Sequence, residues 1–122
     1  MNEDFVPYEL AVKLQEKGYP QKDIVRYDEQ GILYICDYDS PVCAAPTIQQ
    51  TLKWLRKTHK LHIEFVSTAY GYNIIISQTP EAGGTDYYFS HNNYDGPNDG
   101  GAWDEIDDAA VFGINYILDN LI

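Results

Sequence analysis

The side chains that could do chemistry in this chain fall into two groups, and the first carries sulfur or imidazole. It comprises two cysteines and three histidines, namely Cys36, Cys43, His59, His62 and His91. Such groups bind zinc, and a thiol beside a histidine can act as a nucleophile. However, structural zinc sites pair their ligands at close, regular spacing, unlike the six-residue gap between these cysteines. No local nucleophile signature is present either, so we predict no catalytic residue, no metal ligand and no cofactor.

The second group supplies oxygen. Asp37 and Asp39 could form a carboxylate pair, but with their neighbours they are typical of a turn. A later segment, residues 92–99, offers donors that suit calcium: Asn92, Asn93, Asp95, Asn98 and Asp99. The EF-hand order is absent, because Pro97 interrupts the segment and no glutamate closes it. Calcium binding and plain turn chemistry both fit these residues.

Three helices are predicted around these groups. Pro7 can occupy a first helical turn, and apolar residues recur at helical spacing until Gly18, which predicts a helix over residues 7–17. A second helix opens at Pro46 and Thr47 and extends toward Lys60. The third covers residues 103–121, where an apolar face repeats every three to four residues.

The remaining segments predict strands and loops. We predict a hairpin from residues 24–27 and 31–37, followed by a loop at residues 38–45. Apolar and polar residues then alternate over residues 61–66 and 72–77, which predicts two strands joined by a turn at 68–71. A further strand is expected at residues 86–90, followed by an irregular segment at 91–101.

We therefore predict a single α+β domain over residues 1–122, in the order α-β-β-α-β-β-β-α. One antiparallel sheet of four or five strands would carry two or three helices mainly on one face. The opposite face would be polar and wet, since it would display His62, Glu64, Asn73 and Ser77.

Charge is distributed unevenly along the chain. The net charge is −11, and no lysine or arginine follows Lys60, whereas ten acids do, so the second half carries −10. Half of the bases belong to the second predicted helix: Lys53, Arg56, Lys57 and Lys60. Cations near the C-terminus of a helix stabilise the helix, which explains these bases. The second half of the chain carries only negative charges, apart from its histidines, and such a region favours a basic partner.

Residues 46–121 have the element order of a double-stranded RNA-binding domain. That module needs cations at the start of its last helix to meet phosphates. This chain has acids there, so we predict no direct nucleic-acid binding.

Sequence features also bear on compartment. The first residues are acidic, with no apolar run after them, and no window resembles a membrane span. Two cysteines do not make a disulfide framework. We expect a cytoplasmic protein with reduced thiols and no membrane partner.

Three short motifs resemble those of one protein family. They are Phe5-Val6-Pro7-Tyr8-Glu9, then Ala45-Pro46-Thr47-Ile48 with Trp54-Leu55-Arg56, and Ala109-Ala110 with Gly113-Ile114. The family comprises small uncharacterised proteins of Bacteroides genomes, phages and mobile elements. The resemblance spans nearly the whole chain and implies an intracellular accessory protein, with no catalytic residues to transfer.

Two functions fit these features, and self-association is a further hypothesis. The first function is a non-enzymatic interaction protein of phage or mobile-element origin, whose surface would comprise Asp104, Glu105, Asp107, Asp108, Tyr94 and Trp103. The alternative is a small-ligand or metal-dependent enzyme that uses the 91–101 segment and the polar sheet face. Self-association is a third hypothesis, and the oligomeric state stays open.

Overall fold

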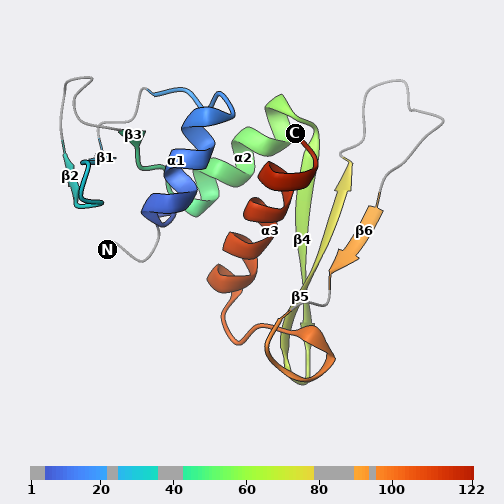
Figure 1. Cartoon of the computed structure of the whole chain (residues 1–122). Helices are drawn as coiled ribbons and strands as arrows, with labels where there is room; N and C mark the ends of the chain where they lie inside the picture. Colours follow the sequence, from blue (N-terminus) through green and yellow to red (C-terminus); the bar gives the residue numbers. More distant parts are fainter. Residues whose placement is uncertain (1–4, 22–24, 36–42, 79–89, 94–95) are drawn as a thin grey trace.

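The computed structural model describes residues 5–21, 25–35, 43–78, 90–93 and 96–122. Within these ranges the chain forms three α-helices and two antiparallel sheets of three strands each. Figure 1 shows the small sheet on one side, the large sheet on the other, and the helices between them. The prediction of an α+β fold is confirmed, but the prediction of one sheet with four or five strands is wrong.

The helices lie where apolar periodicity predicted them. They are α1 (Tyr8–Glu16), α2 (Ile48–Thr58) and α3 (Ile106–Asn120). A capping box begins α2: the Thr47 hydroxyl accepts from the Gln50 N–H, and the Gln50 side chain accepts from the Thr47 N–H. The start of α3 was predicted three residues too early, because the backbone of Trp103 pairs with a strand instead.

The large sheet has the strand order β4-β5-β6, with β4 (Leu61–Thr68), β5 (Gly71–Gln78) and β6 (Ser90–Asn93). The hairpin predicted around residues 68–71 is confirmed. Residues 91–93 were predicted to be irregular, but they pair with β5. Pairing with a neighbouring strand outweighs the low strand propensity of Asn. Of the strand predicted at 86–90, only Ser90 lies within the described residues.

The small sheet has the order β2-β1-β3, with β1 (Val25–Tyr27), β2 (Leu33–Ile35) and β3 (Cys43–Ala44). The predicted first hairpin is confirmed by the β1–β2 pairing. The predicted loop at 38–45 instead contains β3, which pairs with β1. Two residues are too few to show strand periodicity in a sequence, so this strand depends on its tertiary partner.

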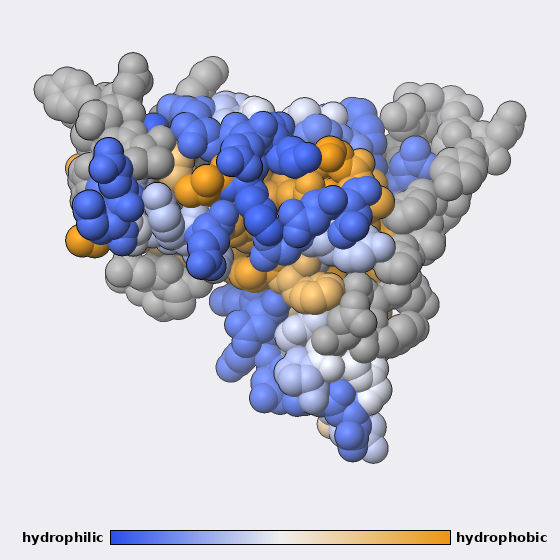
Figure 2. Space-filling view, viewed as in Figure 1, coloured by the Kyte–Doolittle hydropathy of each residue, from blue (hydrophilic) through white to orange (hydrophobic). Residues whose placement is uncertain are grey.

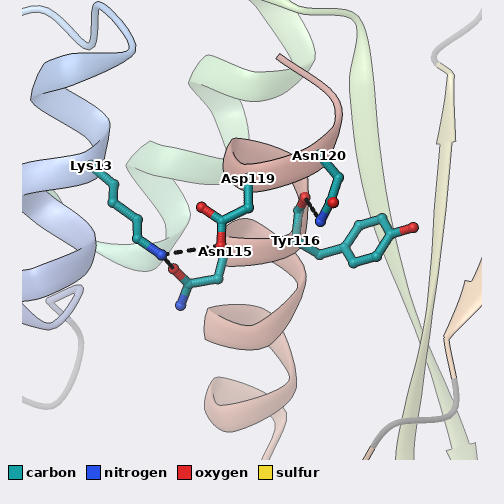
Figure 3. A network of polar contacts seen from close by, with 5 residues as sticks. All are labelled: Lys13, Asn115, Tyr116, Asp119 and Asn120. Atoms are coloured by element: carbon teal, nitrogen blue, oxygen red, sulfur yellow. Dashed lines mark hydrogen bonds and ion pairs between the residues drawn. The ribbon is translucent and has the colours of Figure 1, made fainter.

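One cluster of buried apolar side chains joins the two sheets through the helices. It contains Tyr27 and Cys43 from the small sheet, Leu14 from α1, and Ile74 and Ile76 from β5. Lys13 also links α1 to α3, since its ammonium lies 3.0 Å from Asn115 Oδ1 and 3.2 Å from Asp119 Oδ2 (Figure 3).

The helices α2 and α3 cover one face of the large sheet, as predicted (Figure 1). The other face carries the cross-strand pair of His62 and Ser77 and, next to it, Glu64 opposite Ile75. Glu64 is exposed, but Ser77 is only 6% exposed. The prediction of a wet face is therefore wrong at Ser77.

Candidate interaction surface at the start of α3

Four acids surround the beginning of α3, and all four are exposed: Asp104, Glu105, Asp107 and Asp108. Glu105 is the N-cap residue, and its side chain makes no capping hydrogen bond. Carboxylates here are stabilised by the positive end of the helix dipole. Helix electrostatics therefore explain why acids are tolerated in this position, and the carboxylates remain accessible to a partner.

These four carboxylates form no ion pair with a cation among the described residues. The one ion pair found within that part of the chain joins Lys13 to Asp119 at the other end of α3. The four negative charges at the start of α3 are thus not neutralised by the described fold, which leaves them available for attraction to a basic molecule.

Among the described residues, Tyr70 is the exposed aromatic residue at this end of the molecule. The amide of Asn98 donates to the Tyr70 carbonyl at 2.7 Å and to Asp104 Oδ1 at 2.6 Å. This amide holds the β4–β5 turn against the segment that leads into α3. Tyr70 is 57% exposed, and Ile106 in the first turn of α3 is 42% exposed. An aromatic and an aliphatic side chain therefore accompany the acids.

Trp103 has a structural position. Its indole is 7% exposed and lies 5.0 Å from the Phe112 ring, measured between centroids. Its backbone N–H and C=O pair with Tyr72 at 2.9 and 2.7 Å. Gly71 permits this approach, because a Cβ there would overlap the Trp103 carbonyl. The structure removes Trp103 from the predicted contact residues, and Tyr94 lies outside the described residues.

We define the acidic surface as Tyr70, Asp104, Glu105, Ile106, Asp107 and Asp108. Tyr70 was not among the predicted contact residues, although its position in the predicted turn 68–71 was a usable signal. Turn side chains project into solvent more often than strand side chains do. What the sequence did not show is that the turn reaches the start of α3.

Most of the exposed bases lie along α2 and after it, and they increase in number toward the end of α2 that is distant from the start of α3. Lys53, Arg56, Lys57 and Lys60 are exposed in α2 or directly after it. Lys17, at the end of α1, donates to the Ile122 carbonyl beyond α3 at 2.9 Å. The eight residues of β4 separate Lys60 from the β4–β5 turn, a length of roughly 25 Å. The described surface thus has a basic end and an acidic end.

Hydrophilic residues cover much of the face drawn in Figure 2, with hydrophobic atoms visible between them. One hollow of about 280 Å³ is lined by Thr47, Ile48, Gln49 and Asp107. It lies where the N-terminus of α2 meets the first turn of α3. None of the described residues of the 91–101 segment is among those that line it, so this hollow gives no support to the alternative ligand site at that segment.

The sulfur and imidazole groups do not converge within the described residues. Cys43 is buried in β3, and burial raises the pKa of its thiol, which opposes a nucleophilic role. His59 packs edge-on against Trp54 at 4.8 Å, and His62 lies in β4. Cys36, Asp37 and Asp39 lie outside the described residues.

The described chain also lacks a cluster of three or more acidic, cysteine or histidine side chains that could hold a metal ion. Of the proposed calcium donors, Asn92 and Asn93 belong to β6, and Asp95 lies outside the described residues. The side chain of Asn98 points its amide nitrogen at Tyr70 and Asp104.

The fold and this surface define an α+β protein with an acidic end. No family model, curated protein or solved structure matches the chain. Within the described ranges no helix is both long and apolar enough to span a membrane.

Proposed function

We propose that this protein is a non-enzymatic accessory protein, of phage or mobile-element origin, that binds a basic partner protein through the acidic surface. The origin is proposed from the resemblance of three sequence motifs to small proteins of Bacteroides phages and mobile elements. The binding mode is proposed from the surface itself.

The observation that carries the proposal is the combination of charge and apolar contact area. The carboxylates of Glu105, Asp107 and Asp108 are exposed and have no described cationic partner. Tyr70 and Ile106 are exposed beside them. Charges of one sign accelerate encounter with a partner of opposite sign, whereas aromatic and aliphatic anchors slow its dissociation.

The test is a pull-down from a Bacteroides lysate with the immobilised chain, washed at rising salt concentration. One variant neutralises the surface through Glu105→Gln, Asp107→Asn and Asp108→Asn. The matched control neutralises three exposed acids elsewhere, through Glu9→Gln, Glu16→Gln and Glu29→Gln. Both variants change the net charge by the same amount, so only the position of the charge differs.

We expect the captured proteins to be basic and to elute as salt rises, because salt screens exposed charges. They should be lost with the surface variant and retained with the control variant. Truncating Tyr70 to Ala should also weaken capture while leaving the salt dependence unchanged. Captured partners that are not basic, binding that ignores salt, or equal loss with both variants would refute the proposal.

A further inference from the structure

The outer edge of β4 is a long strand edge without a strand partner among the described residues. In the order β4-β5-β6, β4 pairs with β5 on one side only. Its eight residues pair one to one with those of β5, so the described strand contains no bulge. Figure 1 shows β4 at the border of the large sheet, beside α3.

The Tyr72–Trp103 bridge identifies which β4 backbone groups point outward. Tyr72 directs its N–H and C=O to Trp103, on the side of β5 away from β4. Its partner on β4, Ser67, therefore forms a non-hydrogen-bonded pair with it. Hydrogen-bonded and non-hydrogen-bonded pairs alternate along an antiparallel ladder, so Leu61, Ile63, Phe65 and Ser67 direct their N–H and C=O groups to the open edge.

Soluble proteins usually protect such edges with short strands, bulges, proline or lysine. The β4 sequence has no proline and no lysine within its eight residues, and Glu64 is its one acid. Leu61 and Phe65 remain only partly buried on the helix-covered face, where the sheet ends. The edge therefore combines available backbone groups with apolar side chains that a further strand would cover.

We propose that two copies of this chain associate by antiparallel pairing of their β4 edges over residues 61–65, around a two-fold axis at Ile63. In this register Leu61 faces Phe65 of the second copy, and Ile63 faces its own copy. These are the residues whose backbone groups point outward, so they form the hydrogen-bonded pairs. The large sheets join into one continuous sheet.

Side chains on the opposite face match in the same register. His62 lies across from Glu64 of the second copy, and the symmetry repeats this pair. Both positions are non-hydrogen-bonded, where cross-strand side chains approach most closely. An imidazole N–H can donate to a carboxylate, so residues 61–65 are self-complementary in both hydrogen bonding and apolarity.

The ends of the molecule match as well. In each copy, Asn98 holds the acidic surface beside the β4–β5 turn. Antiparallel pairing brings this turn toward the start of β4 in the other copy, where Lys57 and Lys60 are exposed. This alignment offsets the repulsion between two chains of net charge −11. A parallel alignment would place the two acidic surfaces together.

The test measures the dimer by analytical ultracentrifugation across protein concentrations. His62→Glu should weaken dimerisation at least about tenfold, because two attractive cross-strand pairs become repulsive. Glu64→Lys should also weaken it, and the double variant H62E/E64K should restore it, because each cross-strand pair then joins a carboxylate to an ammonium group. The control Glu9→Lys, on exposed α1, changes the net charge by the same amount as Glu64→Lys and should leave the dimer intact. These variants do not alter the acidic surface, so capture of a basic partner is a separate measurement.

Amide exchange measured by NMR tests the register. Dimerisation should protect the outward N–H groups of Leu61, Ile63 and Phe65, whereas that of Ser67 should exchange as in the monomer. Restoration by the double variant together with this protection pattern supports the proposal. A chain that stays monomeric at NMR concentrations, a dimer insensitive to both single variants, or protection of Ser67 without Leu61 would overturn it.

Discussion

Asn98 holds together the two segments that form the acidic surface. Its amide donates both to the carbonyl of Tyr70 in the β4–β5 turn and to the carboxylate of Asp104 before α3. A bond to a charged acceptor is stronger than one between neutral groups. One neutral side chain therefore positions an aromatic residue beside a group of acids.

Replacing Asn98 by Ala should remove both bonds and lower the free energy of unfolding by about 1–2 kcal/mol. Urea denaturation followed by circular dichroism measures this loss. Asn120→Ala is the control, since its amide makes one exposed bond within α3, to the Tyr116 carbonyl at 3.1 Å (Figure 3), and should cost less than about 0.5 kcal/mol. Equal losses in the two variants would contradict the role of Asn98.

Cys43 and Tyr27 titrate abnormally because they are buried. Burial raises the pKa of the Cys43 thiol above its ordinary value of 9.0 and that of the Tyr27 hydroxyl above 10.0, and a negative charge on Cys43 would raise the latter further. The Tyr27 hydroxyl donates to the Val6 carbonyl at 2.6 Å, a bond that needs the proton. The folded chain is therefore more stable when both groups are protonated than when they are ionised.

The free energy of unfolding should therefore fall as pH rises above about 9, where the unfolded thiol loses its proton and the folded thiol keeps it. Below that pH both states are protonated, and this contribution does not change. Cys43→Ala should remove the decrease in the free energy of unfolding that begins near pH 9. It should keep the larger part of the decrease that Tyr27 causes above about pH 10, because burial is the main cause of the raised Tyr27 pKa. Urea denaturation at several pH values measures both slopes, and parallel profiles for the two chains would refute the assignment.

At the scale of elements, the approach of α3 to the large sheet depends on Gly113. A Cβ at this position would lie 2.9 Å from Ile63 Cδ1 and 3.1 Å from Ile74 Cδ1. Such a distance requires the isoleucine ends to shift, and closely packed interiors resist such shifts. Gly113 is thus the point at which α3 contacts both β4 and β5.

Gly113→Ala should lower the free energy of unfolding by about 1–2 kcal/mol, because overpacking outweighs the roughly 1 kcal/mol that Ala gains in helix propensity. Adding Ile63→Val removes the Cδ1 that the new methyl group meets. In a double-mutant cycle at low protein concentration, the pair should cost less than the sum of the single changes. Simple additivity would indicate that α3 moves away as a whole.

At the scale of the whole molecule, two separate sheets share one apolar core through three helices. The two tryptophans report on different parts of it. Trp54 lies 5.4 Å from Tyr19, between ring centroids, and Trp103 contacts Phe112 near the large sheet. A core that is continuous between these sites should unfold in a single step.

We expect the single-tryptophan variants Trp54→Phe and Trp103→Phe each to show a fluorescence transition that coincides with the circular dichroism transition of the same variant. Comparison within each variant removes the effect of the substitution on stability. Midpoints that differ between the two probes would show that the small-sheet side and the large-sheet side unfold separately.

Local patterns were sufficient for many of the elements. Periodicity located α1, α2 and the β4–β5 hairpin. The acids at the start of α3 agree with the positive end of the helix dipole, which is a local effect. Periodicity did not find β3 or the strand character of residues 91–93, since both form through pairing with distant segments. Periodicity also assigned Trp103 to a helix, and its residue type suggested a contact surface, whereas a backbone bridge and burial determine its position.

The sequence by itself determined the charge of this protein, the order of most of its elements and the presence of acids near the start of α3, because these depend on neighbours within a few positions. Only the tertiary structure decided that strands separate into two sheets, that Tyr70 rather than Trp103 is exposed beside the acids, and that β4 presents an open edge. Those outcomes depend on which distant segments satisfy each other's backbone hydrogen bonds and bury each other's apolar surface, and such pairings leave no local pattern in a single chain.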